Sequence, residues 1–306
     1  MVKYLLKRIG IVLVTLWLLS IVVFILPRVA GDPVYLLLPN EATEEDREEL
    51  REELGLNKSV PEQYLIFMTD VVAHGDFGES VYLKEPVTDL IIDRFPATLK
   101  LASVTFACVM PIGILLGVLA AIRKNRYPDV LARSVAVLGQ SLPGFWVGIM
   151  LILLLSVTWD LLPTSGMGGA DTYVMPVITL GWVSLAGVTR LTRSSMLEVM
   201  GTDYITFLRA RGVAERSVIL KHALRNAAIP VVTMGAMMFG YLLTGSIVVE
   251  SVFTWPGMGR LAYESVSRAD FPLIQAIVLF YGVIFISVNL LADTFYSWLD
   301  PRIRRT

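Results

Sequence analysis

The chain has 306 residues, of which 55% are hydrophobic and 17% are charged, and its formal net charge is -1. This composition is more apolar and less charged than that of an ordinary globular domain, so a membrane protein is favoured over a soluble one. The net charge is near zero because acidic and basic residues lie in different segments and cancel. The single cysteine, Cys108, lies in an apolar run, so no disulfide can form within the chain.

Apolar stretches that could cross a bilayer recur along the chain. A helix needs roughly 20 apolar residues to cross about 30 Å of hydrocarbon, because its backbone polar groups must be satisfied within the segment. Six stretches without Asp, Glu, Lys or Arg meet this requirement, at 9–27, 101–122, 134–157, 173–189, 227–249 and 271–292. The sequence therefore predicts an all-α integral membrane protein with six transmembrane helices.

The first stretch has some features of a secretory signal peptide. It follows Lys3, Lys7 and Arg8 and is followed by the small residue Ala30. Its apolar core is longer than the usual core of a signal peptide, which is about 7–15 residues. We therefore expect this stretch to be retained as the first span.

An acidic segment follows the first span. Thr43 precedes Glu44, Glu45 and Asp46, which is the pattern of a helix cap with an acidic first turn, and Gly55 closes the pattern. A short helix is predicted here, and its surface is either simply solvated, or faces a soluble partner or lines the entrance. We divide the chain into an N-terminal part, 1–98, and a five-span core, 99–306, which contains a long loop at about 190–228.

Basic residues gather at alternate ends of the spans. By the positive-inside rule, these ends and both termini lie in the cytoplasm, and the acidic segments lie outside. His74 and His222 then lie on opposite sides of the membrane, so no metal site is predicted. The basic residues are Lys3, Lys7, Arg8, Arg123, Lys124, Arg126, Arg133, Arg190, Arg193, Arg209, Arg211, Arg216, Lys221, Arg225, Arg302, Arg304 and Arg305.

The absence of certain residues from the sequence narrows the range of possible functions. Ion-coupled transporters place ionisable groups in their spans, and an intramembrane enzyme needs a catalytic set, but the six stretches contain neither. The chain has no GxxxxGK[ST] phosphate loop, so any ATP hydrolysis must occur on another subunit. Gly113-x-x-x-Gly117 and Gly144-x-x-x-Gly148 favour close packing between helices.

The long cytoplasmic loop carries the most informative pattern. It predicts two short helices hinged at Gly212, a residue that tolerates a positive φ. In the second helix, apolar residues such as Val218 and Ile219 oppose basic ones such as Lys221, so this helix could lie along the membrane face. The alternative is an interfacial helix without a partner.

The loop contains Asp203-Tyr204, Arg209-Ala210-x-Gly212 and His222-x-Leu224-Arg225-Asn226-Ala227, followed by Ile229-Pro230-Val231-Val232-Thr233. With these motifs it resembles the coupling loop of ABC importer permeases, in the form found in the dipeptide/oligopeptide permease family. The segments 31–33, 75–80, 94–99, 245–261, 289–293 and 299–304 resemble the same family. The resemblance therefore covers essentially the whole chain.

The resemblance implies a type I ABC importer permease fold and a set of site residues. Thr206 replaces the first glutamate of the general loop pattern, and Arg225 lies near its proline, so a specific glutamate contact is not carried over. The implied coupling residues are Asp203, Tyr204, Thr206, Arg209, Ala210, Arg211, Gly212, Glu215, Arg216, His222 and Arg225. An outer gate or scoop, or alternatively a rigid packed turn, is expected at Glu250, Phe253, Trp255, Pro256, Gly257 and Gly259.

The resemblance also implies partners and a cargo. We expect a homologous second permease, two ATP-binding subunits that hold ATP and Mg, a binding protein outside, and the lipid bilayer, but no nucleic acid. No cofactor is expected on this chain. Di- or oligopeptides are the expected cargo, and glutathione, nickel complexes or oligosaccharides are the alternatives. A secondary transporter is the alternative of a different class.

Overall fold

The computed structural model describes residues 2–30, 34, 43–53 and 55–299. In this part, the chain consists of helices and turns, apart from an isolated bridge between Glu79 and Pro86, so the predicted all-α fold is confirmed. The chain divides into two compact units, Met1–Pro96 with Gly257–Ile286 and Ala97–Pro256 with Ser287–Thr306. The predicted motifs at 31–33 and 300–304, and the basic residues 302, 304 and 305, lie outside the described residues.

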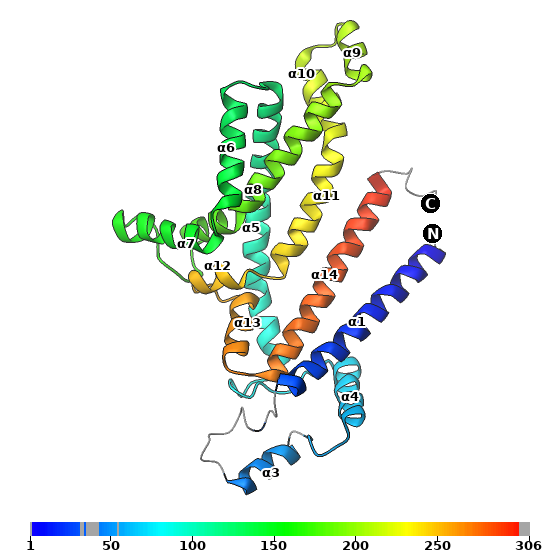
Figure 1. Cartoon of the computed structure of the whole chain (residues 1–306), viewed down its shortest axis with the longest axis vertical. Coiled ribbons are helices and arrows are strands. Elements are labelled where there is room, and N and C mark those ends of the chain that lie inside the picture. The colour runs from blue at the N-terminus through cyan, green and yellow to red at the C-terminus, as the bar shows by residue number, and fades with distance from the viewer. Residues whose placement is uncertain (1, 31–33, 35–42, 54, 300–306) are drawn as a thin grey trace. The chain divides into compact units, whose positions relative to one another are not determined.

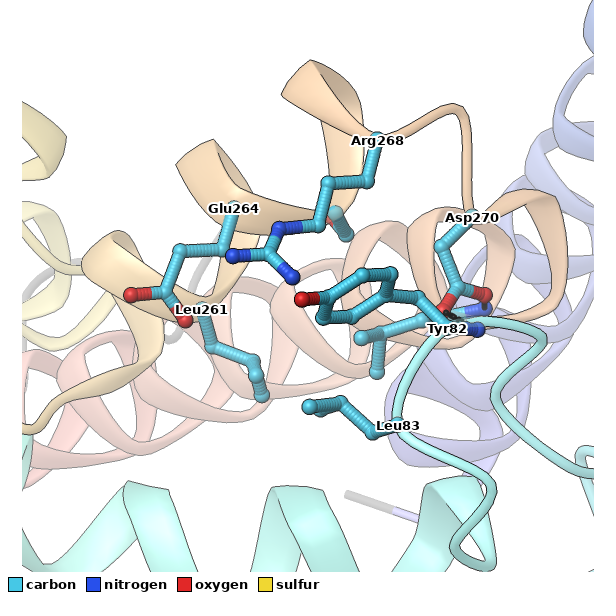
Figure 2. Close-up of a pocket in the computed structure, with 8 residues that line it drawn as sticks. Tyr82, Leu83, Leu261, Glu264, Arg268 and Asp270 are labelled. Carbon is cyan, nitrogen blue, oxygen red and sulfur yellow. Dashed lines mark hydrogen bonds between the residues drawn. The ribbon is translucent and has the colours of Figure 1, made fainter.

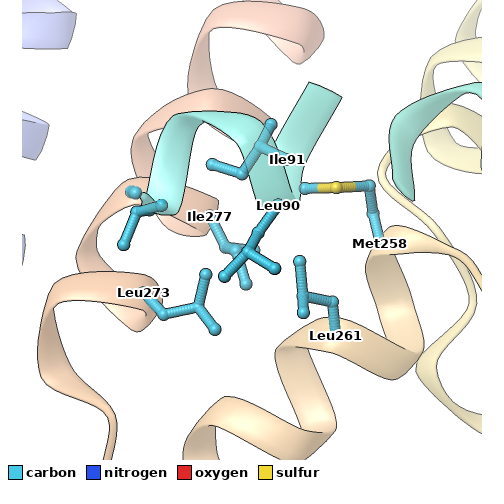
Figure 3. Packing of buried hydrophobic residues seen from close by; sticks show 8 residues of the cluster. Leu90, Ile91, Met258, Leu261, Leu273 and Ile277 are labelled. Atoms are coloured by element: carbon cyan, nitrogen blue, oxygen red, sulfur yellow. The ribbon is translucent and has the colours of Figure 1, made fainter. Parts of the chain in front are cut away.

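The first unit contains α1 (Val2–Ala30), α3 (Glu44–Glu53), α4 (Val60–Thr69) with its π-helical extension η1 (Asp70–His74), and α13 (Met258–Ser267) (Figure 1). The first turns of α5 (Val87–Ile122) and the first half of α14 (Phe271–Leu299) also belong to it. Its core joins apolar side chains from α5, α13 and α14. Figure 3 shows these residues, which include Leu90, Ile91, Met258, Leu261, Leu273 and Ile277.

The helix predicted after Thr43 is confirmed as α3. The Asp46 N–H donates to the Thr43 hydroxyl over 3.2 Å, while the Thr43 N–H donates to the Asp46 carboxylate over 2.9 Å. This reciprocal pair satisfies two donors at the start of the helix, as a capping box does. Gly55, with φ +63°, follows the helix in the left-handed region that glycine favours.

The second unit is built around α8 (Asp171–Met200). Helices α6 (Tyr127–Ser141), α7 (Gly144–Leu151) and α11 (Leu224–Leu243) pack against it. The short helix α12 (Ile247–Val252) packs on α7 and α8. The C-terminal part of α5 also lies against α8, through glycine contacts that are described below.

Five helices in the described residues are long and apolar enough to cross a membrane, and they match five of the six predicted spans. The third prediction is corrected, because residues 134–157 do not form one continuous helix. They are divided between α6 and the shorter segment Gly144–Thr158, which consists of α7 and the π-helix η2 (Ile152–Thr158). Pro143 accounts for the break, because it lacks an N–H and its ring clashes with the preceding turn.

The Gly113-x-x-x-Gly117 motif forms a close contact between α5 and α8. A Cβ added to Gly117 would lie 2.5 Å from the Thr192 Cβ and 2.7 Å from the Thr189 carbonyl oxygen. A Cβ on Gly113 would lie 2.7 Å from the Val188 Cγ1. The two helices therefore approach so closely that only glycine fits, which confirms the packing predicted for this motif. In the second motif, a Cβ on Gly148 would lie 3.2 Å from the Thr179 Cγ2, a looser contact, and a Cβ on Gly144 would meet nothing within 4 Å.

Candidate functional site

The loop between α8 and α11 forms a compact helical hairpin (Figure 1). Its first helix is α9 (Asp203–Ala210), as predicted. Its second helix starts as α10 (Glu215–Ser217) and continues through the π-helix η3 (Val218–Ala223) into α11. The second predicted helix is therefore not a separate one, and its position along the membrane face stays a prediction. The segment is the first part of one long apolar helix, Glu215–Leu243.

Gly212 ends α9 in a Schellman motif. Its φ is +74°, and its N–H donates to the Arg209 carbonyl over 2.9 Å. The N–H of Val213 donates to the Leu208 carbonyl over 3.2 Å. These two bonds satisfy carbonyls that the end of the helix leaves without partners. The bend predicted at Gly212 depends on a positive φ, and this conformation is strained for a residue that carries a Cβ.

Two polar contacts join α9 to the following helix. The Arg209 guanidinium donates from Nε and one terminal nitrogen to the two carboxylate oxygens of Glu215, over 3.1 and 2.7 Å. The Tyr204 hydroxyl lies 2.8 Å from the His222 Nδ1. Four of the predicted coupling residues are thus brought together in two pairs that close the hairpin across Gly212.

The Arg209–Glu215 pair shifts both pKa values apart. Hydrogen bonds from Arg209 hold the pKa of the Glu215 carboxyl below its ordinary 4.5, and the same bonds raise the pKa of the Arg209 guanidinium above its ordinary value. The pair is exposed to solvent, so its contribution to stability is small.

Glu215→Gln should therefore lower thermal stability slightly, and only at some pH values. Because folding depresses the pKa of Glu215, the ion pair stabilises the protein above pH 4.5 and loses this effect as the pH falls through the folded pKa. Thermal unfolding of wild type and variant should thus differ at neutral pH and converge on acidification. A difference that persists unchanged in acid would contradict the role of the carboxylate.

The hairpin is anchored on the ends of the long helices of its own unit. Ile205 of α9 is fully buried, together with Val218 of η3. They pack in one cluster with Val118 of α5 and Met196 of α8. The hairpin is therefore packed directly against the ends of α5, α8 and α11.

The face of the hairpin opposite this cluster is exposed and partly apolar. Phe207 is 57% exposed, Leu220 is 50% exposed and Tyr204 is 47% exposed. Tyr204 is one of the predicted coupling residues, and those that are also exposed are Asp203, Thr206, Arg209, Ala210, Arg211, Gly212, Glu215, Arg216 and Arg225. Exposed aromatic and apolar side chains beside arginines are typical of a protein–protein docking surface.

The segment predicted as an outer gate packs inside the molecule in this conformation. Glu250, Phe253 and Trp255 are each at most 2% exposed. The Trp255 indole N–H donates to the Ala97 carbonyl over 3.0 Å, and the Thr98 hydroxyl donates to the Glu250 carboxylate over 2.9 Å. These contacts, all within the second unit, are those of a rigid turn packed against the bundle, the alternative considered above. Pro256 is half-buried, and Gly257 and Gly259 are buried at the start of α13 in the first unit.

Two hydrogen-bonded pairs of polar residues were not predicted from the sequence. In the second unit, Arg193 of α8 donates over 2.9 Å to the fully buried carboxylate of Asp129 in α6. In the first unit, the Asp270 carboxylate accepts from the Ser80 hydroxyl over 2.5 Å. Both pairs join residues far apart in the chain, and no local pattern signals such a pairing.

The Ser80–Asp270 pair borders a small pocket in the first unit. Figure 2 shows Arg268 stacked on the ring of Tyr82, with its guanidinium carbon 3.4 Å from the ring centroid. Glu264 and Asp270 lie on either side, and Leu83 and Leu261 close the pocket. The contacts around the pocket hold the loop before α5 against α13 and the start of α14.

In the described residues, five apolar helices long enough to cross a membrane, with a helical hairpin anchored on the ends of three of them, are the features of a polytopic membrane protein. The profile of the family described as "Binding-protein-dependent transport system inner membrane component" matches residues 113–305, and the profile of the N-terminal component of these systems matches residues 1–102. The chain belongs to this family of ABC importer permeases, as its resemblance predicted. It is thus a multi-pass inner-membrane protein.

Relatives and solved structures agree with this assignment. The glutathione transport system permease proteins GsiC of Escherichia coli K12 and Shigella flexneri serotype 5b are each 42% identical over 305 residues, with 99% of both chains covered. Two inward-facing structures of the MetNI methionine ABC transporter share the fold, with TM-scores of 0.54 and 0.58. They are 17% and 16% identical, and each alignment covers 69% of this chain and 96% of theirs. The type I permease fold is thereby confirmed.

Proposed function

We propose that this permease is one of two pore-forming subunits of an importer for short peptides. A homologous permease would complete the pore, two ATP-binding subunits would dock inside, and a binding protein would deliver the cargo from outside. The anchored hairpin 203–223 carries this proposal, because its exposed face can receive a partner while its buried face contacts three spans.

In this mechanism, α9 is the coupling helix. ATP and Mg would bind to the partner subunits, whose closure would pull α9 and, through Ile205 and Val218, the ends of α5, α8 and α11. Such packed elements switch between discrete arrangements rather than deform continuously. The chain itself would bind no cofactor. Both termini would lie in the cytoplasm, where the basic residues gather.

The cargo class follows from the family resemblance and from the relatives. Short peptides are the expected cargo, and the relatives named for glutathione, which is itself a modified tripeptide, favour that substrate as a specific candidate. Nickel complexes and oligosaccharides remain alternatives that the same assay distinguishes.

Uptake by the complete transporter tests the proposal. The permease pair, the ATP-binding subunits and the binding protein would be reconstituted in liposomes and supplied with labelled dipeptide, glutathione, maltotriose or a nickel chelate. We expect ATP-dependent uptake of dipeptide or glutathione that requires the binding protein. Uptake by this chain alone, under an ion gradient and without ATP, would instead establish a secondary transporter.

A further inference from the structure

Helix α4 and its extension η1 lie in a segment that the sequence assigns to the aqueous side of α1. This segment, Val60–His74, is too short to span a membrane, yet its surface is unusually apolar. Val72 is 75% exposed and Leu65 is 64% exposed. Large apolar side chains exposed together on one short helix indicate an unrecognised interaction surface.

Contacts with α1 fix the depth of α4. The Tyr64 hydroxyl lies 2.8 Å from the Ser20 hydroxyl, and the rings of Tyr64 and Phe67 pack on Phe24 at centroid distances of 5.2 and 5.8 Å. The Arg28 guanidinium donates to the Gln63 side chain. Figure 1 shows α4 beside the C-terminal end of α1.

Ser20 lies well inside the apolar stretch of α1, which runs from Arg8 to Leu26. At about 1.5 Å per residue, Ser20 lies roughly 9 Å inside the C-terminal end of that stretch. The Tyr64 side chain that reaches it must therefore enter the hydrocarbon region of the bilayer. Phe24 and Phe67 meet near the same level, whereas Arg28 and Gln63 meet at the boundary.

The sequence of α4 and η1 suits this position because it has three distinct faces. Tyr64, Phe67 and Val71 recur at helical spacing on the side toward α1. Glu62, Thr69 and Asp70 share a mainly polar side, which also carries the exposed Ile66. Leu65, Met68 and Val72 share an apolar side that the described residues leave partly or largely uncovered.

Helix α1 continues as an exposed apolar surface on the side that contacts α4. Leu13, which is 62% exposed, and Trp17, which is 53% exposed, recur at helical spacing with Ser20 and Phe24. On another side, α1 packs on α14, where the Gln275 side chain donates to the Val23 carbonyl. An apolar surface that faces acyl chains therefore extends along α1 from its contact with α4.

We propose that α4 and η1 form an interfacial helix, embedded in the leaflet at the C-terminal end of α1, with Leu65 and Val72 in contact with lipid acyl chains. Its polar face, with Glu62 and Asp70, is directed to water and headgroups. Such a helix would hold the acidic segment α3 close to the membrane surface. That this leaflet is the outer one rests on the proposed topology, whereas the embedding of the helix in a leaflet does not.

Spin labels on two faces of the same helix test this inference. Single cysteines at Leu65, Val72 and Glu62 would be introduced into a Cys108→Ala background, because Cys108 is the only native cysteine. The complete transporter would be labelled with a nitroxide and placed in nanodiscs. Collisions with oxygen, which partitions into lipid, would be compared with collisions with a water-soluble nickel complex.

We expect oxygen collisions to dominate at Leu65 and Val72 and nickel collisions to dominate at Glu62. Dominant nickel collisions at Leu65 would show a water-exposed face and overturn the inference. Low collision rates with both reagents at Leu65 would also overturn it, because they would show that a protein partner covers this face. Uptake by each labelled transporter verifies that the fold is intact, and these outcomes do not depend on which cargo is carried.

Discussion

A Gly212→Val variant is expected to assemble with its partners but to lose the stimulation of ATP hydrolysis by the loaded binding protein. Gly212 has φ +74°, and a β-branched residue is strongly disfavoured there. For an ordinary L-residue, this conformation costs about 1–2 kcal/mol. The strain would break the Schellman bonds and reorient α9, while the spans that hold the fold together would remain unchanged.

The matched control for this variant is Gly212→Asn. Asparagine enters the left-handed region several-fold more often than other residues with a Cβ, so it should preserve the turn. A Cβ at this position meets no atom within 4 Å, so the Cβ itself fits in both variants. The measurement is ATPase activity with and without loaded binding protein, beside the melting temperature. Normal stimulation in Gly212→Val would contradict the proposed role of the turn.

Gly117→Val is expected to have the largest effect on stability. The added Cβ would lie 2.5 Å from the Thr192 Cβ and 2.7 Å from the backbone oxygen of Thr189, and the backbone cannot rotate away. Overpacking of a close contact typically costs about 1–3 kcal/mol. The α5–α8 contact should therefore separate, with a lower melting temperature and a lower yield of assembled transporter.

Gly144→Val provides the comparison, because a Cβ there meets nothing within 4 Å. Gly117 ends one G-x-x-x-G motif and Gly144 begins the other, but only at Gly117 would an added Cβ clash with neighbouring atoms. Thermal unfolding of the purified transporter should thus separate the two variants clearly. Equal melting temperatures would show that the α5–α8 contact is looser than the structure indicates.

The fold was predictable where a local physical requirement left a pattern. Spans leave long runs without charge because the bilayer cannot satisfy backbone polar groups. The Thr43 cap and the turn at Gly212 were predictable because helix ends need specific partners and specific backbone angles. Pro143 was a visible signal too, and its effect on the third span could have been inferred.

The features of the fold and the site that the sequence did not predict depend on tertiary contacts. Trp255 is buried because it packs against Leu101 and Tyr173. The pairing of Asp129 with Arg193 arises from the packing of α6 on α8. Residues so far apart in the chain carry no shared local pattern. The continuity of the hairpin with α11 was hidden by its basic residues, which marked a membrane boundary but not a helix end.

Photo-crosslinking from α9 tests the central claim most directly. A benzophenone amino acid would replace Phe207, which is 57% exposed on α9, or Trp159, which is 55% exposed at the end of η2. In the assembled transporter, we predict a crosslink from position 207 to an ATP-binding subunit and none from position 159, which the proposed topology places outside. A crosslink to that subunit from position 159 and not from position 207 would contradict both the docking role of α9 and the orientation of the chain.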